Sequence, residues 1–319
     1  MKIAMIGTGY VGLVSGVCFS DFGHDVVCLD TNPQKIAMLE RGEVPIFEPG
    51  LDVLMAKNVA AGRLRFTTDL DRALDGAQAV FIAVGTPTRR GDGHADLTYV
   101  MAAARDVARA AQGYVVIVIK STVPVGTNAR VREVVAEANP DLDFDVASNP
   151  EFLREGAAIE DFMKPDRVVV GVQTERAADV MADIYRPLYL RDFPILITDL
   201  ESAEMIKYAS NAFLATKISF INEMAHLCEE VGANVQTVAR AMGMDGRIGD
   251  KFLHAGPGYG GSGFPKDTRA IAQIAEKNDV DLKIIKAGIA ANENQKLRMV
   301  TKIKEKLEVL ENKTLGVLG

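Results

Sequence analysis

The spacing of three glycines near the start constrains this chain more than any other feature. Gly7, Gly9 and Gly12 follow the apolar run Ile3–Ile6 and precede a helical pattern. In a strand–turn–helix unit, the first glycine permits the tight turn, the second lets a phosphate approach the backbone, and the third lets the helix pack on the strand. The N–H groups at the start of the helix attract phosphate oxygens. The loop therefore predicts a dinucleotide-binding site.

An acidic residue narrows the cofactor to NAD. Asp30 directly follows the apolar run Asp25–Leu29, about 20 residues after the loop, where such folds bind the adenosine ribose. A carboxylate there repels a 2′-phosphate, and no arginine follows immediately to receive one. We therefore expect NAD as the cofactor, and no metal.

Short apolar runs alternate with helical patterns over the first two hundred residues. Several runs are rich in Val and Ile and apolar on both sides, as strands of a parallel sheet with both faces covered must be. This alternation predicts an α/β fold, a doubly wound and mostly parallel sheet of Rossmann type in residues 1–198. The expected strands are Ile3–Ile6, Asp25–Leu29, Ala79–Val84, Val115–Ile119, Asp145–Ala147, Arg167–Val170 and Ile195–Ile197.

The pattern becomes helical after Thr198. A long helix is expected over Asp199–Val231, and further helices are expected up to about Glu311, separated by a glycine-rich loop. These predict an all-helical dimerisation domain over 199–312. Residues 313–319 resemble a first strand of another α/β unit, so we expect a truncated chain whose third domain is absent.

Composition excludes several functional classes. The net charge of −7 argues against nucleic acid or an anionic membrane as a partner, and no apolar run is long enough for a membrane helix. Three widely spaced cysteines form neither a disulfide framework nor a zinc site, which favours a cytoplasmic protein with buried, inert thiols. An anionic substrate then requires a local basic cluster.

Four further segments combine polar side chains with positions where chemistry is common. The stretches KSTVPVGT (120–127) and SNPEFLREG (148–156) each follow a strand. Lys207 and Asn211 share one helical face, and GYGGSGFPKD (258–267) is a glycine-rich loop before a helix. Each also has a purely structural interpretation: Thr122 and Asp267 as helix caps, the Lys207 pair as a solvated stripe, and the glycines as a mobile loop.

Together, these motifs resemble the UDP-glucose 6-dehydrogenase branch of the nucleotide-sugar dehydrogenases. The resemblance spans the chain in the right order, and the most specific motifs are PEFLREG and GYGGS-x-FPKD. It implies an NAD domain, a helical domain that forms a homodimer and a C-terminal UDP-binding domain. It also implies oxidation of the C6 alcohol of UDP-glucose to UDP-glucuronate with two NAD, through a thiohemiacetal and a thioester, for polysaccharide biosynthesis.

The resemblance implies roles for catalytic residues. Lys207, Asn211 and a water would stabilise negative charge on the C6 oxygen. Asp267 and Thr122 would position that water and assist proton transfer. Glu151 would activate water for thioester hydrolysis.

It implies binding residues as well. The residues expected around the cofactor are Gly7, Gly9, Tyr10, Val11, Gly12, Asp30, Lys35, Thr86, Thr122, Glu155 and Lys266. Those expected around the nucleotide sugar are Glu151, Phe152, Leu153, Arg154, Glu155, Lys207, Asn211, Arg247, Phe252, Leu253, His254, Ala255, Gly256, Tyr259 and Gly260. The expected basic cluster comprises Arg154, Lys207, Arg247, Lys251 and Lys266.

The sequence departs from the family at one decisive position. Gly263 stands where the family carries the cysteine that attacks the aldehyde. Cys228 cannot replace it, because it lies about 25 Å beyond Asn211 by helix rise. A single lost side chain in an intact motif fits a deliberate or artefactual change better than gradual drift. We therefore expect this chain to be inactive or limited to the first oxidation, and its affinity for UDP to be poor without the third domain.

Three alternatives remain open. A β-hydroxyacid dehydrogenase also uses Lys and Asn on one helix and needs no thiol, but it has no role for PEFLREG or GYGGS. A GDP-mannose 6-dehydrogenase is closer, although Tyr259 and Arg247-Ile248-Gly249 favour UDP-glucose. The third is a non-catalytic, NAD-binding dimerisation module.

Overall fold

The computed structural model describes residues 1–87, 89, 95–261 and 263–316. The chain divides into two compact units, Met1–Lys207 and Tyr208–Gly319, and each is described by itself.

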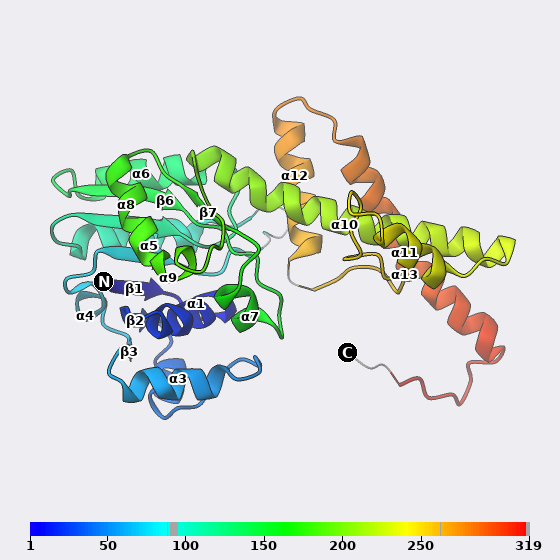
Figure 1. Cartoon of the computed structure of the whole chain (residues 1–319), viewed down its shortest axis with the longest axis horizontal. Helices are drawn as coiled ribbons and strands as arrows, with labels where there is room; N and C mark the ends of the chain where they lie inside the picture. Colours follow the sequence, from blue (N-terminus) through cyan, green and yellow to red (C-terminus); the bar gives the residue numbers. More distant parts are fainter. Residues whose placement is uncertain (88, 90–94, 262, 317–319) are drawn as a thin grey trace. The chain divides into compact units, whose positions relative to one another are not determined.

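The first unit is built on an eight-stranded sheet (Figure 1). The strand order is β3-β2-β1-β4-β5-β6-β7-β8, and all neighbours are parallel except β6 and β7, which are antiparallel. This confirms the predicted doubly wound, mostly parallel sheet. The strands are β1 (Lys2–Ile6), β2 (Asp25–Leu29), β3 (Leu64–Thr67), β4 (Ala79–Ile82), β5 (Val115–Ile119), β6 (Phe144–Ser148), β7 (Val168–Gly171) and β8 (Ile195–Thr198).

Alternation along the strands separates two apolar cores. In β1, Ile3 and Met5 belong to one core, and Ala4 and Ile6 belong to the other. The first core is covered by α1 (Tyr10–Asp21), α2 (Pro33–Glu40), α3 (Leu51–Ala60), α7 (Ala158–Met163), α8 (Glu175–Ile184) and α9 (Arg186–Tyr189). The second is covered by α4 (Leu70–Leu74), α5 (Thr98–Ala110) and α6 (Thr127–Ala138).

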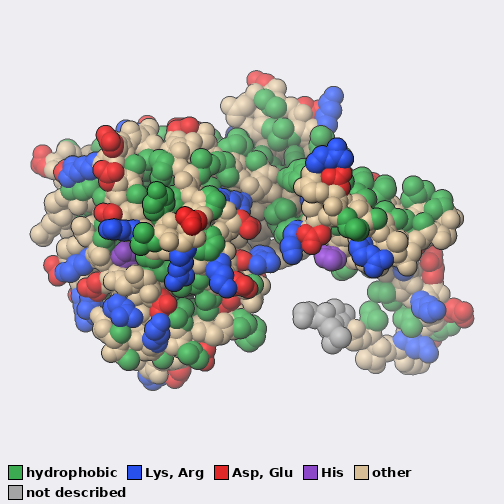
Figure 2. Space-filling view, in the orientation of Figure 1, with side chains coloured by type: hydrophobic (Ala, Val, Ile, Leu, Met, Phe, Trp, Pro, Cys, Tyr) green, Lys and Arg blue, Asp and Glu red, His purple; other side chains and the backbone are tan. Residues whose placement is uncertain are grey.

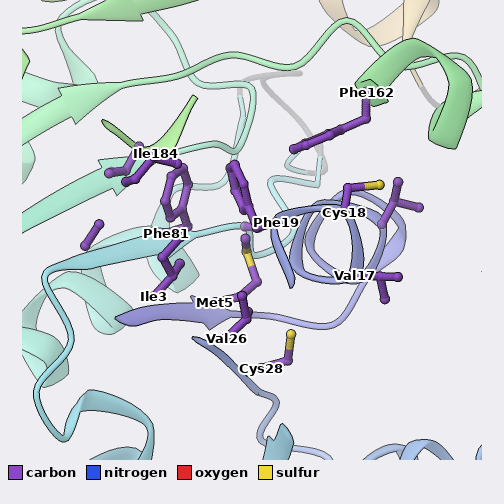
Figure 3. Close-up of a cluster of buried hydrophobic side chains, with 14 of the residues drawn as sticks. Ile3, Met5, Val17, Cys18, Phe19, Val26, Cys28, Phe81, Phe162 and Ile184 are labelled. Atoms are coloured by element: carbon purple, nitrogen blue, oxygen red, sulfur yellow. The ribbon is translucent and has the colours of Figure 1, made fainter. Parts of the chain in front are cut away.

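Aromatic rings fill the first core (Figure 3). The ring of Phe19 lies 4.9 Å from that of Phe81 and 5.1 Å from that of Phe162, centroid to centroid. Cys18 and Cys28 are buried in the same cluster. The packing ties α1, which follows the glycine loop, to α7, which follows the SNPEFLREG segment.

The second unit is helical in its described part. It contains most of α10 (Leu200–Val231), with α11 (Val235–Gly243), α12 (Phe264–Lys277) and α13 (Lys283–Leu307). The strand predicted near the end is not found: residues 313–316 form none, and 317–319 lie outside the described residues.

The charges on the visible face and the helices of the described residues bear on binding to nucleic acids and membranes. On the face seen in Figure 2, acidic and basic side chains are interspersed. Of the helices in the described ranges, none is both long and apolar enough to cross a bilayer.

Candidate active site

Each glycine of the dinucleotide loop lacks a side chain for a different structural reason. Gly7 has φ +98°, and a Cβ there would lie 2.7 Å from the Ala83 carbonyl oxygen. A Cβ on Gly12 would lie 2.0 Å from the Gly7 oxygen. At Gly9, by contrast, a Cβ would meet no described atom within 4 Å, so the space beside the loop is open. The loop therefore leaves room for the pyrophosphate that its sequence predicts, and α1 begins beside it at Tyr10 with no side-chain cap from the described residues.

Asp30 is held as an anion at the end of β2. Its Oδ2 accepts hydrogen bonds from the Thr8 backbone N–H (2.9 Å), the Thr8 hydroxyl (2.7 Å) and Lys35 Nζ (2.9 Å). Burial opposes the charge, but these bonds and one from the Asn32 N–H outweigh it and lower the pKa of Asp30 to about 2. An ionised carboxylate beside the loop fits the ribose hydroxyls of NAD.

Thr86 and Thr122 lie at the carboxyl edge of the sheet. The Thr86 hydroxyl donates to the Thr122 carbonyl (3.1 Å). Thr122 does not cap α6, because Gly126 occupies the N-cap position. The cap interpretation of Thr122 is therefore wrong, and the contact with Thr86 places both cofactor candidates together.

Glu151 and Lys207 form a largely buried ion pair. Lys207 Nζ lies 3.0 Å from Glu151 Oε1, and the side chains are 7% and 13% exposed. Glu151 Oε2 accepts the Leu153 backbone N–H (2.6 Å). The same ammonium lies 5.3 Å from the centre of the Phe152 ring. The solvated-stripe interpretation of Lys207 is thus wrong, because this lysine is shielded and paired.

Asn211, one helical turn further along α10, contacts a buried acid within the second unit. Its Nδ2 donates to Asp267 Oδ2 at 2.6 Å, and Asp267 is 1% exposed. Asp267 is not a helix cap: α12 begins at Phe264, and its N-cap is Gly263. The cap interpretation of Asp267 is therefore wrong, and its carboxylate faces a polar partner on α10.

Position 263 does not require a glycine. Its φ is −95°, and a Cβ there would meet no described atom within 4 Å beyond its chain neighbours. Cys18, Cys28 and Cys228 are free and buried, and burial raises the pKa of Cys28 to about 12. The three cysteines are thus buried as predicted, and the backbone at 263 would accept a side chain.

The predicted substrate loop of the second unit is held by amides. Asn292 Oδ1 accepts the Tyr259 N–H (2.7 Å), and its Nδ2 donates to the Tyr259 carbonyl. Gln295 Nε2 donates to the Gly256 carbonyl (2.5 Å), and Asn222 Oδ1 accepts the Gly256 N–H. The middle of this stretch, at Gly256, and its later part, at Tyr259, are thereby held by side chains of α10 and α13. Phe252 opens the run with φ +64°, an unusual backbone conformation for phenylalanine.

The predicted basic residues are each close to a carboxylate. The pairs are Arg154–Asp161, Lys207–Glu151, Arg247–Asp245, Lys251–Asp250 and Lys266–Asp267. The last two pairs are 4.0 Å apart. Their charges are therefore balanced locally within each unit.

Several polar residues were not predicted from the sequence. Lys120 is 3% exposed, and its Nζ donates to Asn149 Oδ1 at 3.0 Å. Glu48 (6% exposed) and Glu204 (3% exposed) each accept backbone N–H groups of distant segments. Each is a charged residue in the sequence, and that alone does not identify a partner far along the chain. Within the described residues, no cluster of His, Cys, Asp and Glu is suited to a metal.

Known proteins share this architecture. The family model described as "UDP-glucose/GDP-mannose dehydrogenase family, NAD binding domain" matches residues 1–189, and the "central domain" of that family matches 201–294. The UDP-glucose 6-dehydrogenase of Rhizobium meliloti is 61% identical over 95% of this chain and 70% of its own length.

Two solved structures are similar as well. One is a UDP-glucose dehydrogenase from Pyrobaculum islandicum (TM-score 0.92, 44% identity, covering 96% of this chain and 71% of that one). The other is a GDP-mannose dehydrogenase from Pseudomonas aeruginosa (TM-score 0.75, 34% identity, covering 96% and 71%). With the glycine loop and the ionised Asp30, these matches lead to one assignment: the chain belongs to the UDP-glucose/GDP-mannose dehydrogenase family of NAD-dependent oxidoreductases.

Proposed function

We propose that the chain's substrate is UDP-glucose and that its reaction is oxidation of the C6 alcohol, toward UDP-glucuronate. The names of the relatives at 61% and 44% identity support UDP-glucose over GDP-mannose, whose dehydrogenase is 34% identical. The observation that carries the proposal is the pair Lys207 and Asn211. They lie one turn apart on α10, and each is hydrogen-bonded to a carboxylate.

Each polar group of this pair has a role that follows from its contacts. The ammonium of Lys207 and the amide of Asn211 are donors that would stabilise charge as the C6 oxygen loses its proton. Glu151 holds Lys207 and would activate water for thioester hydrolysis. Asp267 holds Asn211, and with Thr122 it would position the catalytic water and assist proton transfer. NAD, when bound, accepts the hydride from C6.

Two loops would hold the ligands. Gly7–Gly12 would receive the cofactor pyrophosphate, with Asp30 and Lys35 at the adenosine ribose. Residues 151–155 would contact the nucleotide sugar, and so would the run 252–260, which Asn292 and Gln295 hold in place. Thr86, Glu155 and Lys266 complete the proposed cofactor contacts. Three free, buried cysteines are consistent with the reducing cytoplasm, which is our proposed location.

Gly263 limits the proposed reaction. The first oxidation removes a hydride and a proton from the alcohol and needs no thiol. The second requires a nucleophile on the aldehyde carbon, and glycine supplies none. We therefore propose that this chain stops at the aldehyde, with one NADH per sugar at most.

Counting NADH in a single turnover tests the proposal. Enzyme in excess over UDP-glucose is mixed with the sugar and saturating NAD, and absorbance reports NADH for the unmodified chain and for Gly263→Cys. We expect no more than one equivalent from the unmodified chain and two from Gly263→Cys. Gly263→Ser is the matched control, since it adds a side chain of similar size without a thiolate, and it should behave like the unmodified chain.

The outcomes separate the alternatives. Two equivalents from the unmodified chain would overturn the role of position 263. A faster reaction of Gly263→Cys with GDP-mannose than with UDP-glucose would overturn the substrate. If Gly263→Cys binds NADH but oxidises neither sugar, the alternative of a non-catalytic, NAD-binding module would be supported.

We also propose a homodimer formed through α10. Phe213, Phe220 and Leu227 recur at seven-residue intervals and are 65%, 41% and 55% exposed. Seven residues are close to two helical turns, so the three side chains lie along one side of the helix. An apolar stripe of this kind is typical of a surface that a second copy covers.

A further inference from the structure

A buried carboxylate joins the dinucleotide loop to the segment 151–156. Glu48 lies in the connection between α2 and α3, far from both segments in sequence, and its side chain is 6% exposed. Its Oε2 accepts hydrogen bonds from the hydroxyl of Tyr10 and from the backbone N–H of Gly156, the latter at 2.9 Å. Its Oε1 accepts the N–H groups of Ala158 (2.8 Å) and Ile159 (3.4 Å). The Glu48 carboxylate thus accepts hydrogen bonds from donors in two segments that are predicted to contact ligands.

Tyr10 takes part in both loops at once. It is the first residue of α1, between Gly9 and Gly12. Its hydroxyl donates to Glu48 and accepts the Gly156 N–H at 3.0 Å. Burial and the neighbouring Glu48 raise the pKa of Tyr10, so the hydroxyl keeps its proton and remains a donor at physiological pH. This hydroxyl therefore joins the first residue of α1 to Glu48 and to the backbone of Gly156.

The same segment leads on to the catalytic pair. Gly156 ends the stretch that begins at Glu151, with φ +87°. Within it, the Leu153 N–H binds Glu151 Oε2, while Glu151 Oε1 binds Lys207. A continuous set of hydrogen bonds and a short backbone segment therefore connects the backbone of the glycine loop with the ammonium of Lys207, all within the first unit.

We propose that Tyr10 and Glu48 are positioning residues that couple the two loops, so that NAD bound at Gly7–Gly12 orders the segment 153–159. A bound pyrophosphate restricts the backbone of residues 9–12, which carries the Tyr10 side chain. Through Glu48 this restriction reaches the N–H groups of Gly156 and Ala158. The functional consequence rests on the proposed function: a pre-ordered segment binds the nucleotide sugar at a lower entropic cost, and the sugar increases NAD affinity by the same factor.

Hydrogen exchange with NADH alone tests the coupling without the sugar. Amide exchange over 153–159 is followed by mass spectrometry, without NADH and at saturation, with occupancy measured by NADH fluorescence in each variant. In the unmodified chain, we expect NADH to slow this exchange by about tenfold, which corresponds to about 1.4 kcal/mol. In Tyr10→Phe, compared at matched occupancy, the slowing should fall below about twofold.

The chain offers a matched control in Tyr114. Its hydroxyl also donates to a carboxylate, Asp145 Oδ2, at 2.9 Å, in the same unit but away from both loops. Tyr114→Phe should keep the full NADH effect on 153–159. Glu48→Gln is a second variant, in which an amide N–H faces the donors of Ala158 or Gly156. Its exchange over 156–159 should be fast with and without NADH.

Each remaining result overturns the proposal. Equal slowing in Tyr10→Phe and the unmodified chain would show that the hydroxyl carries no coupling. No slowing in the unmodified chain at saturation would do the same. A Tyr10→Phe chain that never saturates would place the hydroxyl in cofactor binding itself.

A last measurement uses UDP-glucose. The dissociation constant of NADH should fall in its presence for the unmodified chain and for Tyr114→Phe, but not for Tyr10→Phe. If UDP-glucose has no effect on any chain while NADH still slows exchange, the proposed substrate fails and the coupling stands.

Discussion

At the scale of single residues, Lys120 is an unusual buried charge beneath the segment that carries Glu151. Its ammonium donates to Asn149 Oδ1, which also accepts the Tyr185 hydroxyl at 2.6 Å. Burial lowers the pKa of Lys120 to about 8; Glu151 opposes the shift, and Lys207 adds to it. The folded protein therefore releases this proton at a lower pH than the unfolded chain, in which a lysine titrates near 10.4.

This difference predicts how stability changes with pH. Between about pH 8 and 10, the unfolded chain binds more protons at this position than the folded chain, so the contribution of Lys120 to stability rises with pH. The slope is at most about 1.4 kcal/mol per pH unit. Relative to Lys120→Met, the free energy of unfolding of the unmodified chain should therefore increase from pH 8 to pH 10, as measured by urea denaturation.

Lys57→Met is the control for that experiment. Lys57 is largely exposed, so its replacement removes no buried amine and should not reproduce the difference seen for Lys120→Met. If the curves of Lys120→Met and the unmodified chain remain parallel, the amine is not deprotonated in the folded state.

The positions of some residues could be predicted from the sequence, and those of others could not. Gly7–Gly12 and Asp30 follow a motif in which local spacing determines the geometry, so their placement was predictable. Glu48 and Ala158 are 110 residues apart, and no local pattern connects them. Their contact depends on how α2, α3 and α7 pack on one face of the sheet, which periodicity alone does not specify.

At the scale of elements, Glu204 ties α10 to the start of α6. Its carboxylate is buried and accepts the N–H groups of Gly126 (2.6 Å) and Asn128 (2.9 Å), and the Asn128 side-chain amide (2.7 Å). These backbone N–H groups lie at the N-terminus of α6, where helix donors lack partners. Glu204 lies one turn before Lys207 on α10. Its contact with α6 therefore helps to set where Lys207 lies relative to the sheet.

Glu204→Gln should destabilise the protein. The glutamine amide nitrogen would face a buried N–H donor and leave it unsatisfied, which costs about 1–3 kcal/mol. Chemical denaturation should show a loss of this size. Glu201→Gln, an exposed carboxylate in the first turn of the same helix, should change stability by less than about 0.5 kcal/mol. Equal effects of the two substitutions would show that the contacts of Glu204 with α6 do not stabilise the protein.

The elements were predictable where periodicity is strong. Seven expected strands and α10 are present, because long apolar patterns leave few alternatives. β3 was missed because Arg65 interrupts its apolar pattern. The start of α12 was placed too late: Pro265 in the first turn signals a start near residue 264, and overlooking it produced the incorrect cap interpretation of Asp267.

At the scale of the whole molecule, the proposed dimer depends on the stripe of Phe213, Phe220 and Leu227 on α10. Replacing Phe213 and Leu227 together by glutamate would place two charges on a surface that a second copy must desolvate, and such burial is costly without a partner. We expect the unmodified chain to have about twice its monomer mass of 34.4 kDa at micromolar concentration. The double variant should have the monomer mass by light scattering.

Tyr99→Glu provides the comparison, since Tyr99 lies on α5 in the first unit and is 58% exposed. The same chemical change there should leave the dimer intact, and both variants should keep the circular dichroism of the unmodified chain. NADH binding should survive in the double variant, because the glycine loop and Asp30 belong to the first unit, whereas Phe213 and Leu227 belong to the second. If the double variant remains dimeric, the interface does not include Phe213 and Leu227. If the unmodified chain is monomeric, the proposed dimer does not form.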